Sequence, residues 1–498
     1  MASPMRGVIQ PRSPAPSTQS ESDGHTKIVR NIRRLIWLYI VLLVFEGALR
    51  KWVVPQFSNP LLIIRDPVVI FIYLLALRAK LFPWNGYVIS LAIIAVCSAI
   101  LSLLVLSRYF PWVPNALVTS YGFRSNFLHL PLIFVLGKVL DENDLKKIGW
   151  WILVGMIPMC GLMVAQFEAS PDAFINRTVG LGEALQLDAG GGKIRPPGTF
   201  SFVSGTVFYV AAATAFLIYG ALTLSTYKTW LLIGAGFSIV VAVTVSGSRS
   251  SFVSALLVVL SVVIILVVRP QAVNRFGRSL LVIVIAALVV TRLPFVKEGL
   301  GILSERFTAS AEAAETTVVR GMFERTLGEF TQGLKVINKF PLSGYGLGVG
   351  TAGGARFLVG RSAFLLSESE WQRILLESGP ILGLAFLIWR TLLTLRLGYL
   401  SLVVLIRGSI LPTLLFSAGF LALANGQFGQ PTSLGFAVVL NGFCLAVIQS
   451  KRTGEESGVT LTGMKHHPPK RILRRSEYAS RLHGPDIASD RTNGSLDR

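Results

Sequence analysis

The sequence predicts an all-α integral membrane protein with many transmembrane helices. Of its 498 residues, 52% are hydrophobic and only 15% are charged, and the mean hydropathy is +0.61. A soluble domain usually carries about 25% charged residues. The deficit falls in long uncharged runs such as 87–106 and 254–268, and a helix that crosses a bilayer needs about 20 apolar residues. The composition therefore indicates a polytopic membrane protein.

About twelve apolar runs are candidate transmembrane helices. The ninth is short, and residues 396–408 either lie at the membrane interface or extend the tenth. The approximate spans are 35–54, 61–78, 87–106, 115–137, 148–167, 202–223, 229–247, 252–268, 279–293, 375–395, 409–424 and 433–449. The chain then consists of a basic tail, nine spans, a long loop domain, three further spans and a second basic tail, at 1–34, 35–293, 294–374, 375–450 and 451–498. Both polar tails are expected to be disordered.

The basic residues predict the orientation. Every second loop carries lysine or arginine, as in 27–34 before the first span and 269–278 after the eighth. Because cytoplasmic loops are enriched in these residues, we expect those loops and both termini to be cytoplasmic. The same distribution explains the net charge of +21 without nucleic acid as a partner. The three cysteines lie in apolar runs without metal-ligand spacing, so neither a metal nor a cofactor is expected.

The opposite, extracytoplasmic face receives the loop in the 50s, the loop 168–201, the turn 246–251, the long segment 294–374 and the loop 425–432. A connector of roughly 80 residues is far longer than most loops. Apolar residues recur in it at helical spacing between 320 and 340, which predicts a small domain with short helices. The glycine-rich run 340–354 lacks the context of a dinucleotide fingerprint, and no P-loop motif occurs. We expect the function to reside on this face and to need no nucleotide.

Five ionisable residues interrupt the apolar runs, at Glu46, Arg50, Arg65, Asp66 and Arg124. Each costs about 2.5–3.5 kcal/mol at the middle of a membrane, so such residues normally face a polar cavity or one another. Glu46 and Arg50 are four residues apart and can pair on one helix face. Two interpretations stay open: paired charges that fix helix packing, or a polar cavity that opens outward beneath the long loop.

Two arginines are candidate oxyanion ligands. Arg249 lies among serines and a glycine in "TVSGSRSSFVSA", between two apolar runs. A guanidinium matches phosphate oxygens bidentately, although a tight turn with a snorkelling arginine explains the same pattern. Arg195 follows a glycine run in "GGGKIRPPGTFSF". Two arginines that reach one membrane surface from separate loops could together bind a diphosphate.

The segment "LLSESEWQRILLESGPILG" places acidic residues at the start of an apolar run. Ser367 and Glu370 fit a capping box. Glu370, Arg373 and Glu377 share one helix face, so the arginine is either neutralised by the two glutamates or the glutamates line the polar cavity. Glu368 has no such partner, which makes it the candidate catalytic carboxylate.

Several motifs together resemble the bacterial O-antigen ligase and polymerase superfamily. They are "RGMF", "GLKVINKFPLSGYGLG" and "LLESGPILG", in that order. The turn around Arg249 is similar to the S-x-S-R-S/G turn of this family, and "RPPGTFSF" is similar to its R-x-x-G-T/S-F motif. The resemblance covers residues 35–450.

The resemblance implies a glycosyltransferase of the bacterial inner membrane that uses neither metal nor nucleotide. It would transfer a glycan from undecaprenyl diphosphate to a glycan or lipid acceptor outside the membrane, with polymerisation of exopolysaccharide favoured over ligation. In the family, arginines hold the diphosphate; the matching positions are Arg195 and Arg249, with Arg320 and Arg373 as further candidates. The reaction would be direct displacement at the anomeric carbon, in which Arg249 stabilises the departing diphosphate. Polysaccharide export and chain-length proteins are possible partners.

The sequence departs from this family at one position. Ligases of the family commonly have a histidine where this chain has Glu368, and no histidine lies between His129 and His466. A carboxylate base or a mechanism based on arginine electrostatics would have to replace it. Two other functions remain: a polysaccharide-related secondary transporter or flippase, against which the lack of an internal repeat argues, and a non-catalytic scaffold of an export complex.

Overall fold

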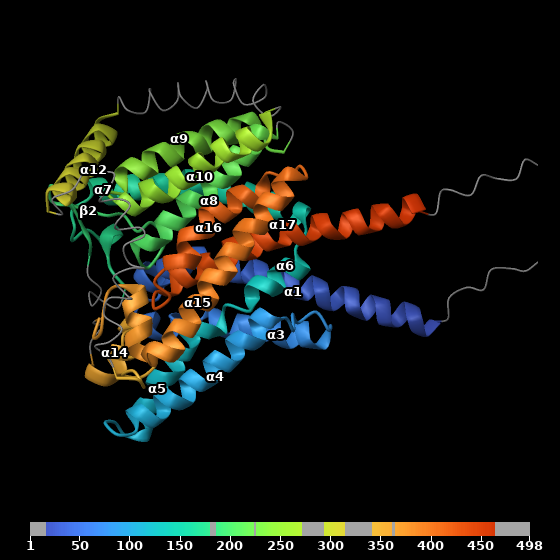
Figure 1. The fold of residues 1–498 in the computed structure, drawn as a ribbon. Coiled ribbons are helices and arrows are strands. Elements are labelled where there is room, and N and C mark those ends of the chain that lie inside the picture. The colour runs from blue at the N-terminus through green and yellow to red at the C-terminus, as the bar shows by residue number, and fades with distance from the viewer. Residues whose placement is uncertain are drawn as a thin grey trace, which may run out of the picture. The chain divides into compact units, whose positions relative to one another are not determined.

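The computed structural model describes residues 16–179, 186–223, 226–270, 293–313, 341–360 and 364–463. Within these ranges the chain is mostly helical, and the only strands are β1 (Asp188–Gly190) and β2 (Lys193–Ile194), an antiparallel pair (Figure 1). The all-α prediction is confirmed. The chain up to Lys451 forms one compact unit and Arg452–Arg498 a second.

Seven helical segments of the described residues are long and apolar enough to cross a membrane. They are Pro55–Arg78, which includes α2 (Ser58–Leu61) and α3 (Arg65–Arg78), α4 (Gly86–Leu106), α7 (Glu142–Glu168), α8 (Val203–Leu222), α10 (Arg249–Val268), α15 (Glu370–Ile406) and Pro431–Lys451 of α17 (Pro431–Gly463). Helices α9 (Thr229–Val245) and α16 (Leu411–Asn425) are shorter and also apolar. The predicted ninth span, 279–293, lies almost wholly outside the described residues.

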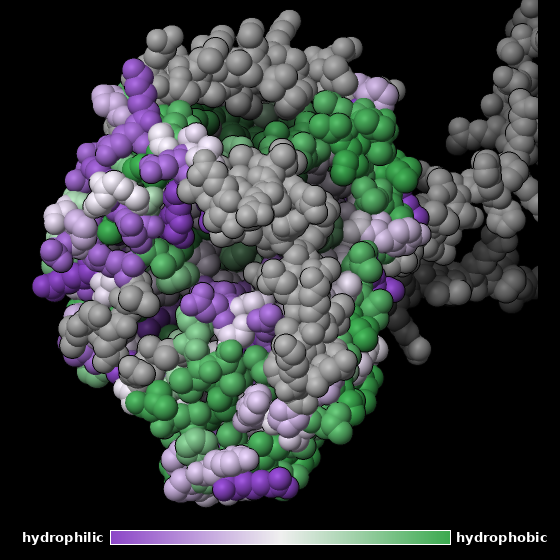
Figure 2. Space-filling model, turned by 60° about the vertical axis from the view of Figure 1, so that its left-hand side comes forward, coloured by the Kyte–Doolittle hydropathy of each residue, from purple (hydrophilic) through white to green (hydrophobic). Residues whose placement is uncertain are grey.

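The outside of the helical unit is apolar over large areas. Large hydrophobic side chains such as Phe71, Ile93 and Val267 are more than half exposed. Figure 2 shows hydrophobic residues in broad green areas, with the hydrophilic residues gathered mainly at the left of the view. A soluble monomer rarely exposes apolar patches of this extent. Because helices satisfy their own backbone hydrogen bonds, such a surface is suited to lipid, and the chain is a membrane protein.

The α-helix of the first predicted span, 35–54, ends at Ala48, before the predicted end. Helix α1 (Pro16–Ala48) runs into a π-helical turn, η1 (Leu49–Val53), and a 3-10 turn, η2 (Pro55–Phe57). Its last turn carries Glu46, and η1 carries Arg50 and Lys51, all three of them buried. The polar end of α1 is therefore enclosed by protein rather than by lipid.

The predicted fourth span, 115–137, is not one continuous helix. It consists of α5 (Trp112–Phe123), the π-helical turn η3 (Arg124–Leu128) and α6 (Leu132–Val139). The prediction of a single helix is wrong because Arg124 and His129 both turn toward Asp66 on α3, and Pro131, just before α6, has no N–H to donate.

Helix α15 settles one open alternative, since residues 396–406 extend the tenth span as part of the same helix. The helix is broken at Gly379, where φ is 72° and ψ is 170°, ahead of Pro380. At this break the loop 341–351 packs against it: Tyr345 N–H donates to the carbonyl of Leu376 at 2.8 Å, and Gly346 N–H to that of Glu377 at 3.0 Å.

We expect Gly379→Ala to lower the free energy of unfolding by at least about 1 kcal/mol, because only glycine adopts this backbone conformation without strain. An added Cβ would also lie 2.2 Å from the Leu342 carbonyl oxygen. Gly161→Ala is the matched control, since a Cβ at Gly161 in α7 meets nothing within 4 Å. Unfolding in mixed detergent micelles compares the two, and equal stabilities would contradict the expectation.

Because neighbouring helices run in opposite directions, one end of the unit collects many helix termini. Four helices end there, α1, α7, α9 and α16, and four begin there, α8, α10, α15 and α17. The β-hairpin, α12 (Pro294–Ala313) and α14 (Ala352–Val359) lie at the same end, at the left of Figure 1. This end carries the loops that the sequence assigns to the extracytoplasmic face.

Candidate functional site

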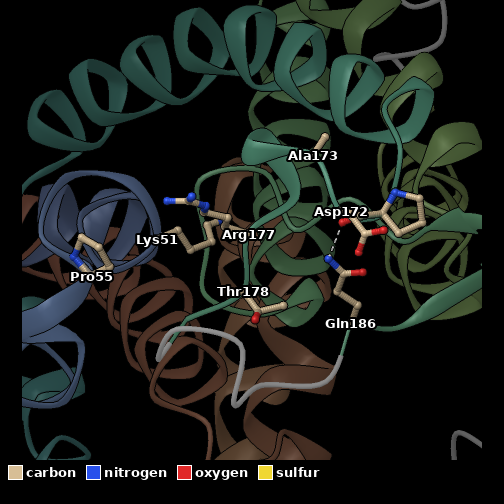
Figure 3. A pocket seen from close by; sticks show the side chains of 8 residues that line it. Lys51, Pro55, Asp172, Ala173, Arg177, Thr178 and Gln186 are labelled. Atoms are coloured by element: carbon tan, nitrogen blue, oxygen red, sulfur yellow. Dashed lines mark hydrogen bonds between the residues drawn. The ribbon is translucent and has the colours of Figure 1, made fainter.

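A cavity of about 370 Å³ lies at this end of the unit (Figure 3). A second, smaller space adjoins it, and the two share Lys51, Arg177, Thr178 and Gln186. The larger cavity is completed by Pro55, Pro171, Asp172 and Ala173. The smaller one continues past Arg195 to Ser201, Phe202 and Val203, where helix α8 begins. We refer to the two together as the cationic cavity.

Lys51 is the most unusual group of the cationic cavity. Its side chain is 1% exposed, and its Nζ donates to the carbonyl of Gly198 at 2.6 Å and lies 4.5 Å from the centre of the Trp52 ring. No described carboxylate forms an ion pair with it. A buried charge is costly unless an opposite charge compensates it. An anion in the cavity would supply that charge.

Arg177 is held at the cavity by the loop that follows α7. The side chain of Asn176 donates to the carbonyls of Gln166 and Ser170 at 3.0 and 2.9 Å, which fixes the loop against the end of the helix. Gln186 Nε2 donates to the carbonyls of Pro171 and Asn176, each at 2.8 Å. The guanidinium of Arg177 lies 4.7 Å from the Phe174 ring centre. The exposed guanidinium of Arg177 therefore packs against the ring of Phe174.

The structure brings the predicted pair Arg195 and Arg249 to the same end and adds a third arginine. Arg195 Nε donates to the carbonyl of Asp188 at 3.1 Å, and Arg306 donates to the carbonyls of Asp188 and Gly247 at 3.3 and 2.8 Å. Arg249 in turn donates to the carbonyl of Arg306 at 3.0 Å. Of the three, Arg195 lines the cationic cavity, whereas Arg249 and Arg306 fasten α12 to the hairpin and to the start of α10.

The predicted cavity residues of the first spans are paired with one another instead. Glu46 accepts from Arg50 and Arg65, both at 3.1 Å, and Asp66 pairs with Arg124. All five side chains are buried, and none lines either part of the cationic cavity. They therefore do not contribute to this cavity, and their contacts favour the interpretation as charges that fix helix packing.

His129 belongs to the same buried group and was not predicted. Its Nε2 lies 2.9 Å from Asp66, and its Nδ1 lies 3.0 Å from the Tyr39 hydroxyl. Tyr39 also lies against Arg65, with 5.4 Å between the guanidinium and the ring centre. These contacts join α1, α3 and the break after α5 into one polar core.

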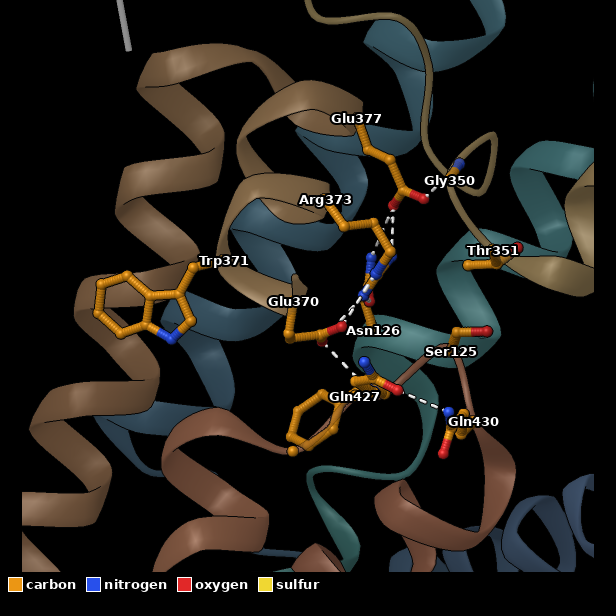
Figure 4. A network of polar contacts seen from close by, with 12 residues as sticks. Ser125, Asn126, Gly350, Thr351, Glu370, Trp371, Arg373, Glu377, Gln427 and Gln430 are labelled. Atoms are coloured by element: carbon orange, nitrogen blue, oxygen red, sulfur yellow. Dashed lines mark hydrogen bonds and ion pairs between the residues drawn. The ribbon is translucent and has the colours of Figure 1, made fainter. Parts of the chain in front are cut away.

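The glutamates of α15 form a second buried network around Arg373 (Figure 4). Arg373 donates to Glu370 at 2.9 Å, to Glu377 at 2.7 Å and to Asn126 at 2.8 Å. The predicted shared face and the neutralised arginine are confirmed. Four of the five N–H donors of Arg373 are engaged within the network and the residue is 3% exposed, so its guanidinium is committed to the two glutamates and Asn126.

The capping-box prediction for Glu370 is wrong. Ser369 is the N-cap residue, without a side-chain cap, and Glu370 is the first residue of the helix. Its carboxylate points inward, where it also accepts from Arg390 and from the backbone N–H of Phe428, both at 3.1 Å. Glu370 and Glu377 are each 1% exposed and line neither part of the cationic cavity.

Glu368 is exposed and also lies outside the lining of the cationic cavity. Its backbone carbonyl accepts from Gln427 Nε2 at 2.7 Å. Gln427 Oε1 accepts from Gln430 at 2.5 Å, and Gln430 Oε1 accepts from the hydroxyl of Ser204 at 3.0 Å. The loop of Glu368 is therefore tied to the first turn of α8. Arg320, the remaining candidate, lies outside the described residues.

Chemically, the cationic cavity is suited to a ligand with more than one negative charge. Lys51, Arg177 and Arg195 line it, and the N-terminus of α8, where backbone N–H groups and the helix dipole favour anions, begins at its wall. Lys51 and Arg177 were not predicted as site residues from the sequence, although Arg177 lies in the loop 168–201 that the sequence assigns to the extracytoplasmic face. Within the described ranges, no group of three histidine, cysteine or acidic residues is placed to hold a metal.

Comparison with protein-family models, curated proteins and solved structures finds no match for this chain.

Proposed function

We propose that this chain is a membrane glycosyltransferase that polymerises or transfers glycans linked to undecaprenyl diphosphate. The observation that carries the proposal is the cationic cavity, in which the buried Lys51, together with Arg177 and Arg195, forms no ion pair with a described carboxylate. The resemblance in sequence motifs supplies the identity of the anion as a lipid-linked diphosphate. Polymerisation is the preferred reaction and ligation the alternative.

In the proposed reaction the diphosphate is the leaving group. An acceptor hydroxyl attacks the anomeric carbon, the bond from that carbon to the phosphate oxygen breaks, and the negative charge develops on the diphosphate. Cations placed in advance around that charge lower the barrier. Arg177 and Arg195 have the planar guanidinium that matches phosphate oxygens, and Lys51 contributes a compact charge. The lipid chain of the donor can lie against the apolar outer surface.

The proposal includes the site of action. The protein resides in the bacterial inner membrane with about twelve spans and both termini in the cytoplasm, as the basic loops predict. The cationic cavity then faces outward, at the same end as the loops 168–201 and 425–432. Glycan export and chain-length proteins are proposed partners on that face.

The experiment is a gene deletion followed by mass spectrometry of the extracted lipid-linked glycans. Complementation uses the parent protein, Arg195→Gln, which removes a cavity charge, and Arg249→Ala. We expect single repeat units to accumulate in the deletion strain and to persist with Arg195→Gln, provided that this variant inserts at normal levels. Long chains that stay on the lipid would identify a ligase. Lipid-linked glycans identical to those of the parent strain would contradict the glycosyltransferase and favour a transporter of another solute.

A further inference from the structure

The cationic cavity contains an acidic residue that the sequence analysis did not single out. Of the residues described as lining its two parts, Asp172 alone carries a carboxylate. Asp172 is exposed and forms no ion pair among the described residues, in contrast to the buried glutamates of α15. It is available to a molecule that occupies the cavity.

The position of Asp172 relative to the cations is specific. In Figure 3, Lys51 and Arg177 lie together on one side of the cavity and Asp172 lies on the other side beside Gln186, with Thr178 between the two sides. Gln186 donates to the carbonyl of Pro171, directly before Asp172, at 2.8 Å, so the chain at Asp172 is anchored. The volume of about 370 Å³ falls in the range of roughly 300–1,000 Å³ that small-molecule sites occupy.

This separation suits a displacement at the anomeric carbon. The acceptor approaches the face of the sugar opposite to the leaving group, so the group that takes the acceptor proton and the groups that hold the leaving group belong on opposite sides. A sugar ring between the two walls would present its diphosphate to Lys51 and Arg177 and its other face toward Asp172.

We propose that Asp172 is the general base of the transfer reaction, an inference that rests on the proposed function. Its carboxylate takes the proton of the acceptor hydroxyl while the acceptor oxygen bonds to the anomeric carbon. The bond between that carbon and the phosphate oxygen breaks, and its electron pair leaves with the diphosphate. The proton stays on Asp172 until solvent removes it. No oxidant, metal or nucleotide takes part.

Asp172 replaces Glu368 in this role. Glu368 is outside the lining of the cationic cavity, and its contact with Gln427 is made by its backbone carbonyl, not its carboxylate. The loop after α7 therefore supplies the base as well as Arg177, and the loop before α15 does not.

The test uses full-length purified protein in lipid nanodiscs, with lipid-linked glycan extracted from the deletion strain as the donor. Asp172→Asn should lower kcat by at least about 100-fold, within the usual contribution of general base catalysis, while KM for the donor changes little. It should also abolish the loss of rate at acidic pH that protonation of the base causes in the parent. Asp172→Glu should restore part of the rate. Glu305→Gln, an exposed glutamate on α12, is the control and should match the parent.

Each other outcome is decisive. If Asp172→Asn turns over donor like the parent, Asp172 is not the base, and the proposed function stands. If instead Glu368→Gln loses both the rate and the acidic limb of the pH profile, the base is Glu368, and the inference is overturned. If the parent protein itself does not consume the donor, the proposed function fails together with the inference. Thermal unfolding of every variant identifies a loss of fold.

Discussion

Glu370→Gln should lower the free energy of unfolding by about 3–5 kcal/mol, the usual cost of removing one partner from a buried ion pair. Glu370 is 1% exposed and accepts from Arg373 and Arg390, which are 3% and 0% exposed. The substitution keeps the shape of the side chain but leaves Glu377 as the only carboxylate near two buried guanidinium groups. Unfolding with a denaturing detergent in mixed micelles measures the effect.

Glu142→Gln is the matched control for this prediction. Glu142 also pairs with two cations, Lys146 at 3.1 Å and Lys451 at 2.7 Å, but its side chain is 23% exposed and those of the lysines are 37% and 45% exposed. Solvent-exposed pairs contribute about 0–1 kcal/mol. If both substitutions cost less than about 1 kcal/mol, the network around Arg373 does not stabilise the fold as its burial implies.

Lys51→Met should abolish most glycan transfer without destabilising the protein. Methionine has a similar length and no charge, so the variant loses the one fully buried cation of the cationic cavity. Removal of a single charge-stabilising group commonly lowers turnover by about 100- to 1,000-fold. Stability should change by no more than about 1 kcal/mol, because relief of the buried charge offsets the lost hydrogen bond to Gly198. Turnover of extracted lipid-linked glycan and thermal unfolding measure the two effects.

Lys51→Arg and Lys297→Met are the controls for this substitution. Lys51→Arg keeps the charge and should retain part of the turnover. Lys297 is exposed on α12 at the same end of the unit, and Lys297→Met should behave like the parent. Equal losses from Lys51→Met and Lys297→Met would show that general surface charge, rather than the cavity, attracts the donor.

The helices and the local pairs could be predicted from the sequence because their causes are local. Long apolar runs predict the helical segments that are long and apolar enough to cross a membrane. The pair Glu46–Arg50 and the triplet Glu370, Arg373 and Glu377 follow from the repeat of the α-helix, and the ion pairs of the structure match that spacing.

The features that escaped prediction depend on contacts between distant segments. Glu370 fits a capping box by sequence, yet Arg390, 20 residues later, draws its carboxylate inward. The break in the fourth predicted span depends on Asp66, 58 residues before Arg124. Neither partner is visible in the local sequence.

The cationic cavity was missed for the same reason. Lys51 directly follows Arg50, and the sequence offers no sign that one of them pairs inward with Glu46 while the other lines the cavity. Both residues lie in the π-helical turn η1, which replaces the last turn of the predicted span, and their side chains point in different directions from it. Arg177 and Asp172 belong to a loop whose shape is fixed by the amides of Asn176 and Gln186. Only the folded chain places them opposite each other.

The central claim is that the cationic cavity binds the diphosphate of a lipid carrier, and direct binding tests it. We would titrate undecaprenyl diphosphate into the protein in nanodiscs and compare the parent with the double variant Lys51→Met/Arg177→Met. We predict that the double variant binds at least about tenfold more weakly and that added salt weakens binding to the parent. Equal affinities of the two proteins would contradict the claim.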